Sequence, residues 1–200
     1  MTVLLVRHGE TTWNVEGRIQ GWAGAPLSGR GREQARTTGE TLASAGVDRL
    51  VVSDLQRTQE TARLLAEGGL DVDRAFESAW RERDFGDYQG LDRATVAERH
   101  AEFDADGSLT GVESVPGGES RSGFLDRVRE GWRAVADAGH DETVAVVSHG
   151  GPIRAVVADV TDRGFETLAR EWSPENCGIT EIDVTGHPTV VRRDDTGHLD

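Results

Sequence analysis

Residues 2–10 read TVLLVRHGE, a short apolar run that is followed at once by polar and charged residues and a glycine. Two later stretches repeat this design, RLVVSDLQR at residues 49–57 and TVAVVSHGG at residues 143–151. Each run is rich in valine or leucine and lacks polar alternation, which is typical of a strand buried on both faces of a sheet. Stretches with helical spacing separate the runs, so their order predicts a mainly parallel α/β sheet covered by helices.

Helix signals fill the stretches between these runs. A serine before one stretch and glycines after others are typical helix caps, and they predict four long helices. Two further runs, GITEIDV at 178–184 and PTVVRR at 188–193, predict two more strands that pair in antiparallel fashion. The predicted helices cover residues 28–45, 55–67, 121–138 and 151–162.

One segment departs from this alternation. Residues 91–120 hold a short helix signal followed by the polar, glycine-rich stretch DADGSLTGVESVPGGES. Such a composition is typical of a surface excursion, and we expect it to act as a lid or specificity segment. The rest of the sequence shows no repeat and no linker, so residues 1–200 are expected to form a single domain.

The charge balance limits the classes of partner. The chain has 36 acidic and 22 basic residues, and its formal net charge of -14 repels nucleic acid phosphates and anionic membrane surfaces. No stretch approaches the roughly 20 apolar residues of a membrane span, and the first ten residues lack the order of a secretory signal. A single cysteine, Cys177, excludes an internal disulfide and a multi-cysteine metal site. We therefore expect a cytoplasmic protein with no nucleic acid or membrane partner, and leave its oligomeric state open, a homodimer included.

The basic residues are unusual in kind. All 22 are arginines, and the sequence contains no lysine. Arginine in place of lysine follows from GC-rich codon usage, but codon usage does not require so large an acidic excess. The composition therefore favours a halophilic protein with an acidic surface, which is an inference about environment and not about chemistry.

Ligands of open parallel sheets bind at the carboxyl ends of the strands, and each apolar run is followed there by reactive side chains. Arg7 and His8 follow the first run, Arg57 comes soon after the second, and His149 and Gly150 follow the third at a helix start. Arginine forks match phosphate oxygens, a helix start offers N–H groups to an anion, and imidazole is both a nucleophile and a proton carrier. Together these residues indicate phosphoryl transfer.

Spacing alone leaves two points open. An Arg-His pair carries little weight by itself, since a second pair, Arg99-His100, follows no strand and is typical of a solvated helix face. A general acid must also protonate the leaving oxygen. The stretch WRERDFGDYQG offers Glu82, Asp84 and Asp87 for that role, and each could equally be a surface acid paired with an arginine.

Six stretches of the chain, taken in order, resemble the histidine phosphatase superfamily, also called the phosphoglycerate mutase-like family. The resemblance implies a three-layer α/β/α domain whose first-strand histidine is transiently phosphorylated. The stretches are LLVRHGETTWNVEGRIQGWAGAPLSGRGREQA, VVSDLQRTQETA, WRERDFGDYQG, PGGES, VVSHGGPIR and RDDTGHLD.

The resemblance also implies a role for each matching residue. His8 matches the nucleophile of the family and Glu82 matches its proton donor. Arg7, Arg57 and His149 match its phosphate pocket. No metal and no organic cofactor is implied. The supplementary phosphate and substrate contacts of the family are matched by Asn14, Gln20 and Gly21, with Gly150 at the helix start.

The branch of the family decides the reaction. Mutase members usually carry a longer insertion with an arginine pair for the substrate carboxylate, whereas residues 91–120 are short, contain no Arg-Arg and are rich in carboxylates. Gly150-Gly151 follows the second histidine where the mutases typically have Gly-Asn, and the tail DDTGHL is similar to the phosphatase branch. We therefore expect a phosphatase with few cationic contacts for a glycerate. The alternatives are a 2,3-bisphosphoglycerate-dependent phosphoglycerate mutase and an inert phospholigand-binding protein, the latter disfavoured because no core residue is missing.

Overall fold

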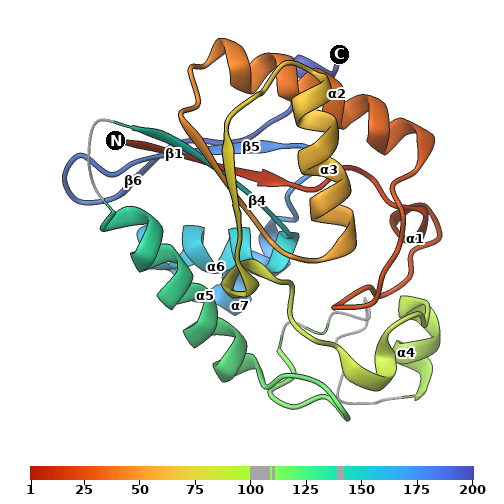
Figure 1. Ribbon diagram of the computed structural model, residues 1–200. Coiled ribbons are helices and arrows are strands. Elements are labelled where there is room, and N and C mark those ends of the chain that lie inside the picture. Colours follow the sequence, from red (N-terminus) through yellow and green to blue (C-terminus); the bar gives the residue numbers. More distant parts are fainter. Residues whose placement is uncertain (100–108, 110, 139–141) are drawn as a thin grey trace.

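The computed structural model describes residues 1–99, 109, 111–138 and 142–200, and within them the chain forms a six-stranded sheet (Figure 1). The strands are β1 (Thr2–Arg7), β2 (Arg49–Val52), β3 (Asp73–Phe76), β4 (Thr143–Ser148), β5 (Ile179–Asp183) and β6 (Thr189–Asp195). Their order is β3-β2-β4-β1-β5-β6, in which the first four are parallel to one another and β5 and β6 pair in antiparallel fashion. This order confirms the predicted α/β class and its mainly parallel sheet.

Helices cover both faces of the sheet, which confirms the three-layer arrangement (Figure 1). The helices α2 (Gly29–Ser44) and α3 (Gln56–Glu67) lie on one face, and α5 (Arg121–Ala136) and α6 (Gly150–Val160) lie on the other. The shorter helices are α1 (Thr12–Val15), α4 (Arg93–Arg99) and α7 (Phe165–Glu171), with single turns η1 (Ser78–Trp80), η2 (Gly86–Tyr88) and η3 (Gly197–Leu199).

Alternate residues of β1 enter two separate apolar cores. Val3 and Leu5 pack in a cluster with side chains of α5 and α6, whereas Leu4 and Val6 pack in a cluster with side chains of α2 and α3. All four are buried, which is why the run shows no polar alternation. Burial of each side chain contributes about 1.5–3 kcal/mol. The centre of the sheet is therefore firmly held, and so are the residues that follow its strands.

The predicted boundaries agree with the structure to within two residues. The helix predicted from the Ser28 cap begins at Gly29, and the Ser28 hydroxyl accepts a hydrogen bond from the Gly31 N–H. The helix predicted over 121–138 ends at Ala136, and the glycine expected to stop it, Gly139, lies outside the described residues.

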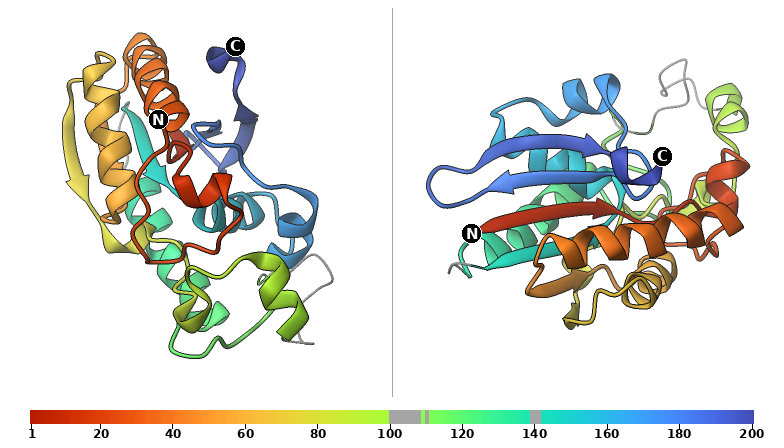
Figure 2. Two further views of the ribbon diagram at one scale, coloured as in Figure 1. Left: turned by 90° about the vertical axis from the view of Figure 1, so that its right-hand side faces the viewer. Right: turned by 90° about the horizontal axis from the view of Figure 1, so that it is seen from above.

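The elements that the sequence analysis missed are short or exposed. Strand β3 lies at one edge of the sheet and β6 lies at the other edge (Figure 2). All four residues of β3 are exposed, so its sequence contains no apolar run that would predict a strand. Helix α7 buries only Leu168, and α1 is a single turn. None of these carries the periodicity on which prediction depends.

Helix α4 and the loops around it lie beyond the carboxyl ends of the parallel strands (Figure 2). Their apolar side chains form a separate cluster that includes Ile19, Tyr88, Val96 and Val115. Of the expected lid over 91–120, residues 100–108 and 110 lie outside the described residues, as does His100 of the second Arg-His pair. Across the part of the chain that the structure describes, no helix has the length and apolar character that crossing a bilayer requires.

Candidate active site

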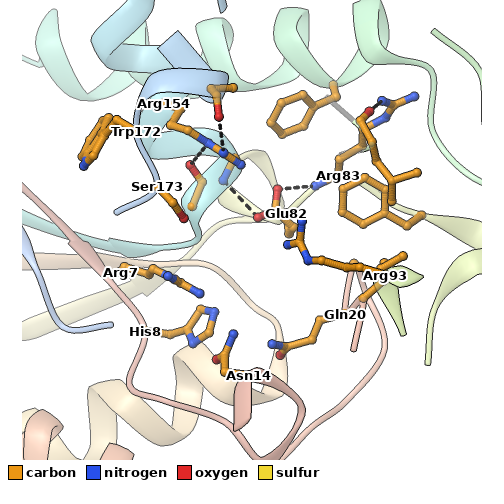
Figure 3. A pocket seen from close by; sticks show the side chains of 18 of the residues that line it. Arg7, His8, Asn14, Gln20, Glu82, Arg83, Arg93, Arg154, Trp172 and Ser173 are labelled. Carbon is orange, nitrogen blue, oxygen red and sulfur yellow. Dashed lines mark hydrogen bonds between the residues drawn. The ribbon is translucent and has the colours of Figure 1, made fainter. Parts of the chain in front are cut away.

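A cavity of about 360 Å³ opens at the carboxyl ends of β1 and β4, between the sheet and the loops around α4. Figure 3 shows Arg7, His8, Asn14 and Gln20 on one side of it and Glu82, Arg93 and Arg154 across from them. Arg57, Gly21 and Gly150 also line it. Of the residues that the family resemblance assigned to the site, the described lining of the cavity therefore includes all except His149.

His8 follows β1 directly and its side chain is buried. Its Nδ1–H donates to the Gly9 carbonyl at 2.8 Å, which leaves the lone pair on Nε2. Burial lowers the pKa of His8 well below its usual value, and the charges of Arg57 and Arg7 lower it further. The ring is therefore neutral and has the tautomer that a nucleophilic Nε2 requires.

Arg57 projects from the first turn of α3 and is almost fully buried. Its Nε–H donates to His149 Nδ1 at 3.1 Å, and its Nη1 and Nη2 donate to the carbonyls of Ala23 (3.2 Å) and Gly21 (2.7 Å). Burial lowers the pKa of Arg57 to about 10, so the guanidinium stays charged at neutral pH. A guanidinium has five N–H groups, so two of them are left for a ligand.

Arg7 supplies a second guanidinium beside His8. Its Nη1 donates to the Pro174 carbonyl, whereas its buried Nε has no hydrogen-bond partner among the described residues. Burial lowers the pKa of Arg7, and the charge of Glu82 across the cavity partly offsets this effect. An unpaired buried donor is costly, and an anion in the cavity would satisfy it.

His149 is the N-cap of α6, and its ring is fully buried behind Arg57. Its Nδ1 accepts from Arg57, and its Nε2 lies 2.8 Å from Ser53 Oγ. Burial and the Arg57 charge lower the pKa of His149 well below its usual value. The His149 ring also lies beside the ring of His8, with the two ring centroids 5.2 Å apart.

Glu82 follows η1, and backbone donors hold both of its carboxylate oxygens. Oε1 accepts from the Arg83 N–H at 2.9 Å and Oε2 accepts from the Gly151 N–H at 3.0 Å. The positive end of the α6 dipole therefore faces this carboxylate. The neighbouring Asp84 instead accepts from the Gly86 N–H in a local turn, at 2.9 Å. Of these two carboxyls, Glu82 is the one that lines the cavity.

The supplementary residues serve in different ways. Asn14 Oδ1 accepts from the backbone and the hydroxyl of Thr11, so its amide N–H groups are the part left for a ligand. Gln20 Oε1 is buried without a partner among the described residues. Gly21 acts through its carbonyl on Arg57, and its φ of +56° favours glycine.

Several arginines of the cavity were missed as functional residues in the sequence. Seven arginines and two glutamates line the described cavity. Arg93 comes from α4, and Arg154 comes from α6, where it donates to the carbonyls of Gly150 (3.1 Å) and Ala169 (3.4 Å). Arg154 could have been found from its place four residues after Gly150, which puts both on one face of the helix.

The arginines that line the cavity, which we call the cationic wall, correct the expectation that the chain offers few cationic contacts for a glycerate. That expectation counted the carboxylates of residues 91–120. Two of them, Glu113 and Glu119, form ion pairs outside the cavity lining, with Arg121 at 3.2 Å and with Arg127 at 2.7 Å. The expectation was wrong because it counted charges along the segment, whereas Arg154 reaches the cavity from a different element. Within the described residues, no group of three or more His, Cys, Asp or Glu side chains is arranged to hold a metal ion.

Comparisons with known proteins cover nearly the whole chain. A Salmonella paratyphi B protein named "Probable phosphoglycerate mutase GpmB" is 34% identical over 211 residues, which cover 100% of this chain and 95% of that protein. The structure is similar to that of the alpha-ribazole phosphatase from Shigella flexneri, with a TM-score of 0.86, 26% identity and coverage of 98% and 96% of the two chains.

A further similar structure is the phosphoserine phosphatase from Entamoeba histolytica in complex with 3-phosphoglyceric acid. The TM-score is 0.80 and the identity 25%, over 100% of this chain and 99% of that one. Solved structures of similar fold thus include phosphatases, while curated relatives carry a mutase name. The family model of the histidine phosphatase superfamily (branch 1) matches residues 3–196, and the chain belongs to that superfamily.

Proposed function

We propose that this protein hydrolyses small phosphomonoesters through a phosphohistidine at His8. One observation carries the proposal. The His8 tautomer leaves its lone pair on Nε2, in a cavity where Arg7 and Arg57 have N–H groups to spare. A neutral imidazole beside two guanidinium groups is suited to attack on a phosphoryl group.

In the first half-reaction, His8 Nε2 attacks phosphorus in line with the ester oxygen, so that an N–P bond forms and the P–O ester bond breaks. Arg7 and Arg57 stabilise the negative charge that spreads over the three equatorial oxygens. Glu82, in its protonated form, gives its proton to the departing alkoxide. The alcohol then leaves the cavity.

In the second half-reaction, the Glu82 carboxylate takes a proton from a water molecule that attacks the phosphohistidine. The N–P bond breaks, its electron pair returns to Nε2, and inorganic phosphate leaves. Neutral His8 and protonated Glu82 are restored. Glu82 thus serves as acid and then as base, from the position that Arg83 and Gly151 fix.

The cationic wall supports a narrower substrate class, phosphomonoesters that carry a carboxylate. Arg154 donates to two neutral carbonyls, which do not balance its charge, and Arg93 lines the same cavity. The 3-phosphoglyceric acid in the Entamoeba histolytica structure belongs to this class. In the Arg154→Gln variant, we expect a higher KM for the substrate 3-phosphoglycerate and a nearly constant KM for an alkyl phosphate that has no carboxylate.

A mutase is the second candidate, because curated relatives at 34% identity bear that name and the wall can hold a glycerate. The deciding experiment is a panel of phosphomonoesters that includes 3-phosphoglycerate with and without 2,3-bisphosphoglycerate. Hydrolysis faster than formation of 2-phosphoglycerate supports the phosphatase. If the bisphosphate stimulates mutase turnover and this turnover is faster than hydrolysis, the protein is a mutase and not a phosphatase. The roles of His8 and Glu82 would stay the same.

We also propose that residues 1–200 act as one catalytic domain. In it, the segment over 91–120 contributes to specificity through Arg93, which lines the cavity from α4. This part of the proposal is tested by Arg93→Gln, which we expect to change the ranking of substrates in the same panel.

A further inference from the structure

The backbone that carries Glu82 is held by side chains from elsewhere in the chain. Glu82 is the last of residues 78–82, which comprise η1 and the turn after it, and every carbonyl in this segment accepts a hydrogen bond from a side chain. Ser148 donates to the Trp80 carbonyl and Trp22 Nε1 donates to that of Glu82, both at 2.7 Å. The Arg127 guanidinium donates to four of the carbonyls, at 3.2 Å for Ser78, 3.0 Å for Ala79, 3.0 Å for Arg81 and 3.3 Å for Glu82.

Arg127 projects from α5, and all three nitrogens of its guanidinium are bonded within the protein. Besides the backbone carbonyls, Nε and Nη2 donate to the two carboxylate oxygens of Glu119 at 2.9 Å and 2.7 Å. The side chains of Arg127 and Glu119 are only 20% and 19% exposed, and a fork-to-fork pair of this kind fixes the orientation of the guanidinium. Arg127 is absent from the described lining of the cavity, so its contacts reach the reaction through the residues that it holds.

Helix α5 approaches η1 closely because residue 131, one turn after Arg127, is a glycine. Residues four apart lie on the same face of a helix, so Gly131 and Arg127 both face η1. A Cβ at Gly131 would lie 2.8 Å from the Ala79 Cβ and 3.6 Å from the Trp80 ring. Nonbonded carbon atoms reach their optimum at about 3.5–4.0 Å. A side chain at position 131 would therefore push η1 away from α5 and lengthen the bonds from Arg127 to the carbonyls.

We propose that Arg127 is a positioning residue for the proton donor, because it holds residues 78–82 so that the Glu82 carboxyl faces the leaving oxygen of the substrate. The N–H groups of Arg83 and Gly151 bind the carboxylate, but only while the backbone of Glu82 lies within their reach. Gly151 lies in the first turn of α6, and α5 and α6 pack in one apolar cluster. One helix thus holds the backbone of Glu82 while its neighbour holds the carboxylate. The inference rests on the proposed function, since a proton donor is needed only if an ester oxygen leaves.

The test compares Arg127→Met with a matched control, Arg129→Met. Arg129 lies on the same helix and pairs with the carboxylates of Asp126 at 3.3 Å and Asp159 at 3.4 Å. The substrates are glycerol 3-phosphate, whose leaving alkoxide needs a proton, and p-nitrophenyl phosphate, whose leaving group does not. For Arg127→Met, we expect kcat/KM to fall about 10- to 100-fold with glycerol 3-phosphate and less than about threefold with p-nitrophenyl phosphate. Arg129→Met should change neither value by more than about twofold.

Two further variants separate positioning from a loss of folding. Arg127→Lys keeps a positive charge for Glu119, but a lysine ammonium lacks the planar fork that bonds to several carbonyls at once. Its loss with glycerol 3-phosphate should lie between those of the wild type and Arg127→Met. Gly131→Ala keeps Arg127 and raises the helix propensity of α5, yet it should also lower activity more with glycerol 3-phosphate than with p-nitrophenyl phosphate. If Arg127→Met does not fold, these two variants provide the same comparison of substrates.

A double-mutant cycle with Glu82→Gln identifies the residue through which Arg127 acts. The proton donor is already lost in Glu82→Gln, so adding Arg127→Met should lower kcat/KM for glycerol 3-phosphate by less than about a further threefold. A merely structural role of Arg127 would lower kcat/KM by the same factor in both backgrounds.

Either of two results would overturn the role of Arg127. One is an Arg127→Met variant whose kcat/KM falls by the same factor with both substrates, or keeps the wild-type value with both. The other is a double variant in which the effects of Arg127→Met and Glu82→Gln on glycerol 3-phosphate are fully additive. Failure of the proposed function has a different signature, a folded wild-type protein that hydrolyses neither substrate.

Discussion

Gly151, the second residue of α6, is predicted not to tolerate a side chain, because Glu82 occupies the space where one would lie. A Cβ at Gly151 would lie 2.0 Å from Glu82 Oε1 and 3.0 Å from its carboxyl carbon. Nonbonded heavy atoms reach their optimum at about 3.5–4.0 Å, so the carboxylate must move by more than about 1 Å in the Gly151→Ala variant. The backbone N–H of residue 151 would remain, which makes the change a displacement of Glu82 and not the loss of its partner.

The expected magnitude depends on the leaving group. A misplacement of about 1 Å can lower a rate about 100-fold, and a general acid is worth about 100- to 10,000-fold. We therefore expect Gly151→Ala to lower kcat/KM by about 100-fold for an alkyl phosphate such as 3-phosphoglycerate. For p-nitrophenyl phosphate, whose leaving group needs no proton, the loss should stay below about tenfold.

The assay measures both substrates for the wild type, Gly151→Ala, Glu82→Gln and a matched control, Gly29→Ala. Gly29 also lies in the first turn of a long helix, but no atom lies within 4 Å of the place of its Cβ. Glu82→Gln should show the same dependence on the leaving group as Gly151→Ala, and Gly29→Ala should show none. Equal losses for the two substrates, or no loss at all, would refute the assignment of Glu82 as the proton donor.

Three further predictions concern stability. Burial lowers the pKa of His8 and His149, so the unfolded chain binds more protons than the folded one below pH 6.5, and stability is lost as the pH falls. Each ring contributes up to about 1.4 kcal/mol to the free energy of unfolding per pH unit. Between pH 7 and about 5, the free energy of unfolding measured with denaturant should therefore fall less steeply for His8→Asn than for the wild type. An equally steep fall would contradict this prediction. The net charge of -14 predicts that the melting temperature rises from low salt to about 1 M KCl, because salt at that concentration shortens the Debye length to about 3 Å and screens the repulsion between carboxylates. If the melting temperature does not change, codon bias becomes the explanation of the lysine-free composition. The Arg83 guanidinium donates to four backbone carbonyls at 2.7–3.2 Å, those of Leu109, Val112, Glu113 and Glu119. The Arg83→Met variant should therefore have a free energy of unfolding lower by about 2–3 kcal/mol and should be cleaved faster by a protease near residue 112. Cleavage at the wild-type rate would show that these hydrogen bonds do not hold the segment in place.

Much of the fold could be predicted because its central strands are buried on both faces. The runs around Leu5, Val51 and Val146 have no polar alternation for that reason, and each of them forms a strand of the sheet. Strand β3 could not be predicted in this way, since its four residues, DRAF, are exposed at the sheet edge and depend on pairing with β2.

The site was predictable where a residue directly follows a buried strand. His8 and Arg7 were named on that ground, and the structure brings both to the cavity. The choice of Glu82 over Asp84 and Asp87 came only from the family resemblance, because the contact of Glu82 with Gly151 joins residues far apart in the sequence.

Two features of the site depend on geometry that no spacing shows. Arg93 and Arg154 line one cavity from two different helices. A count of charges along residues 91–120 alone therefore underestimated the positive charge around the cavity. The buried contacts of His149 with Arg57 and His8 join residues far apart in the sequence.

The central claim is that His8 becomes phosphorylated during turnover, and trapping the phosphoenzyme tests it most directly. The enzyme is mixed with a phosphodonor, quenched within a single turnover and digested, and the peptide that contains His8 is analysed by mass spectrometry. We predict a phosphoryl group on His8 that is labile in acid and stable in base, and that is absent from His8→Ala, which should have no turnover. Labelling that persists in His8→Ala, or a wild-type enzyme that turns over substrate with His8 never modified, would contradict the account.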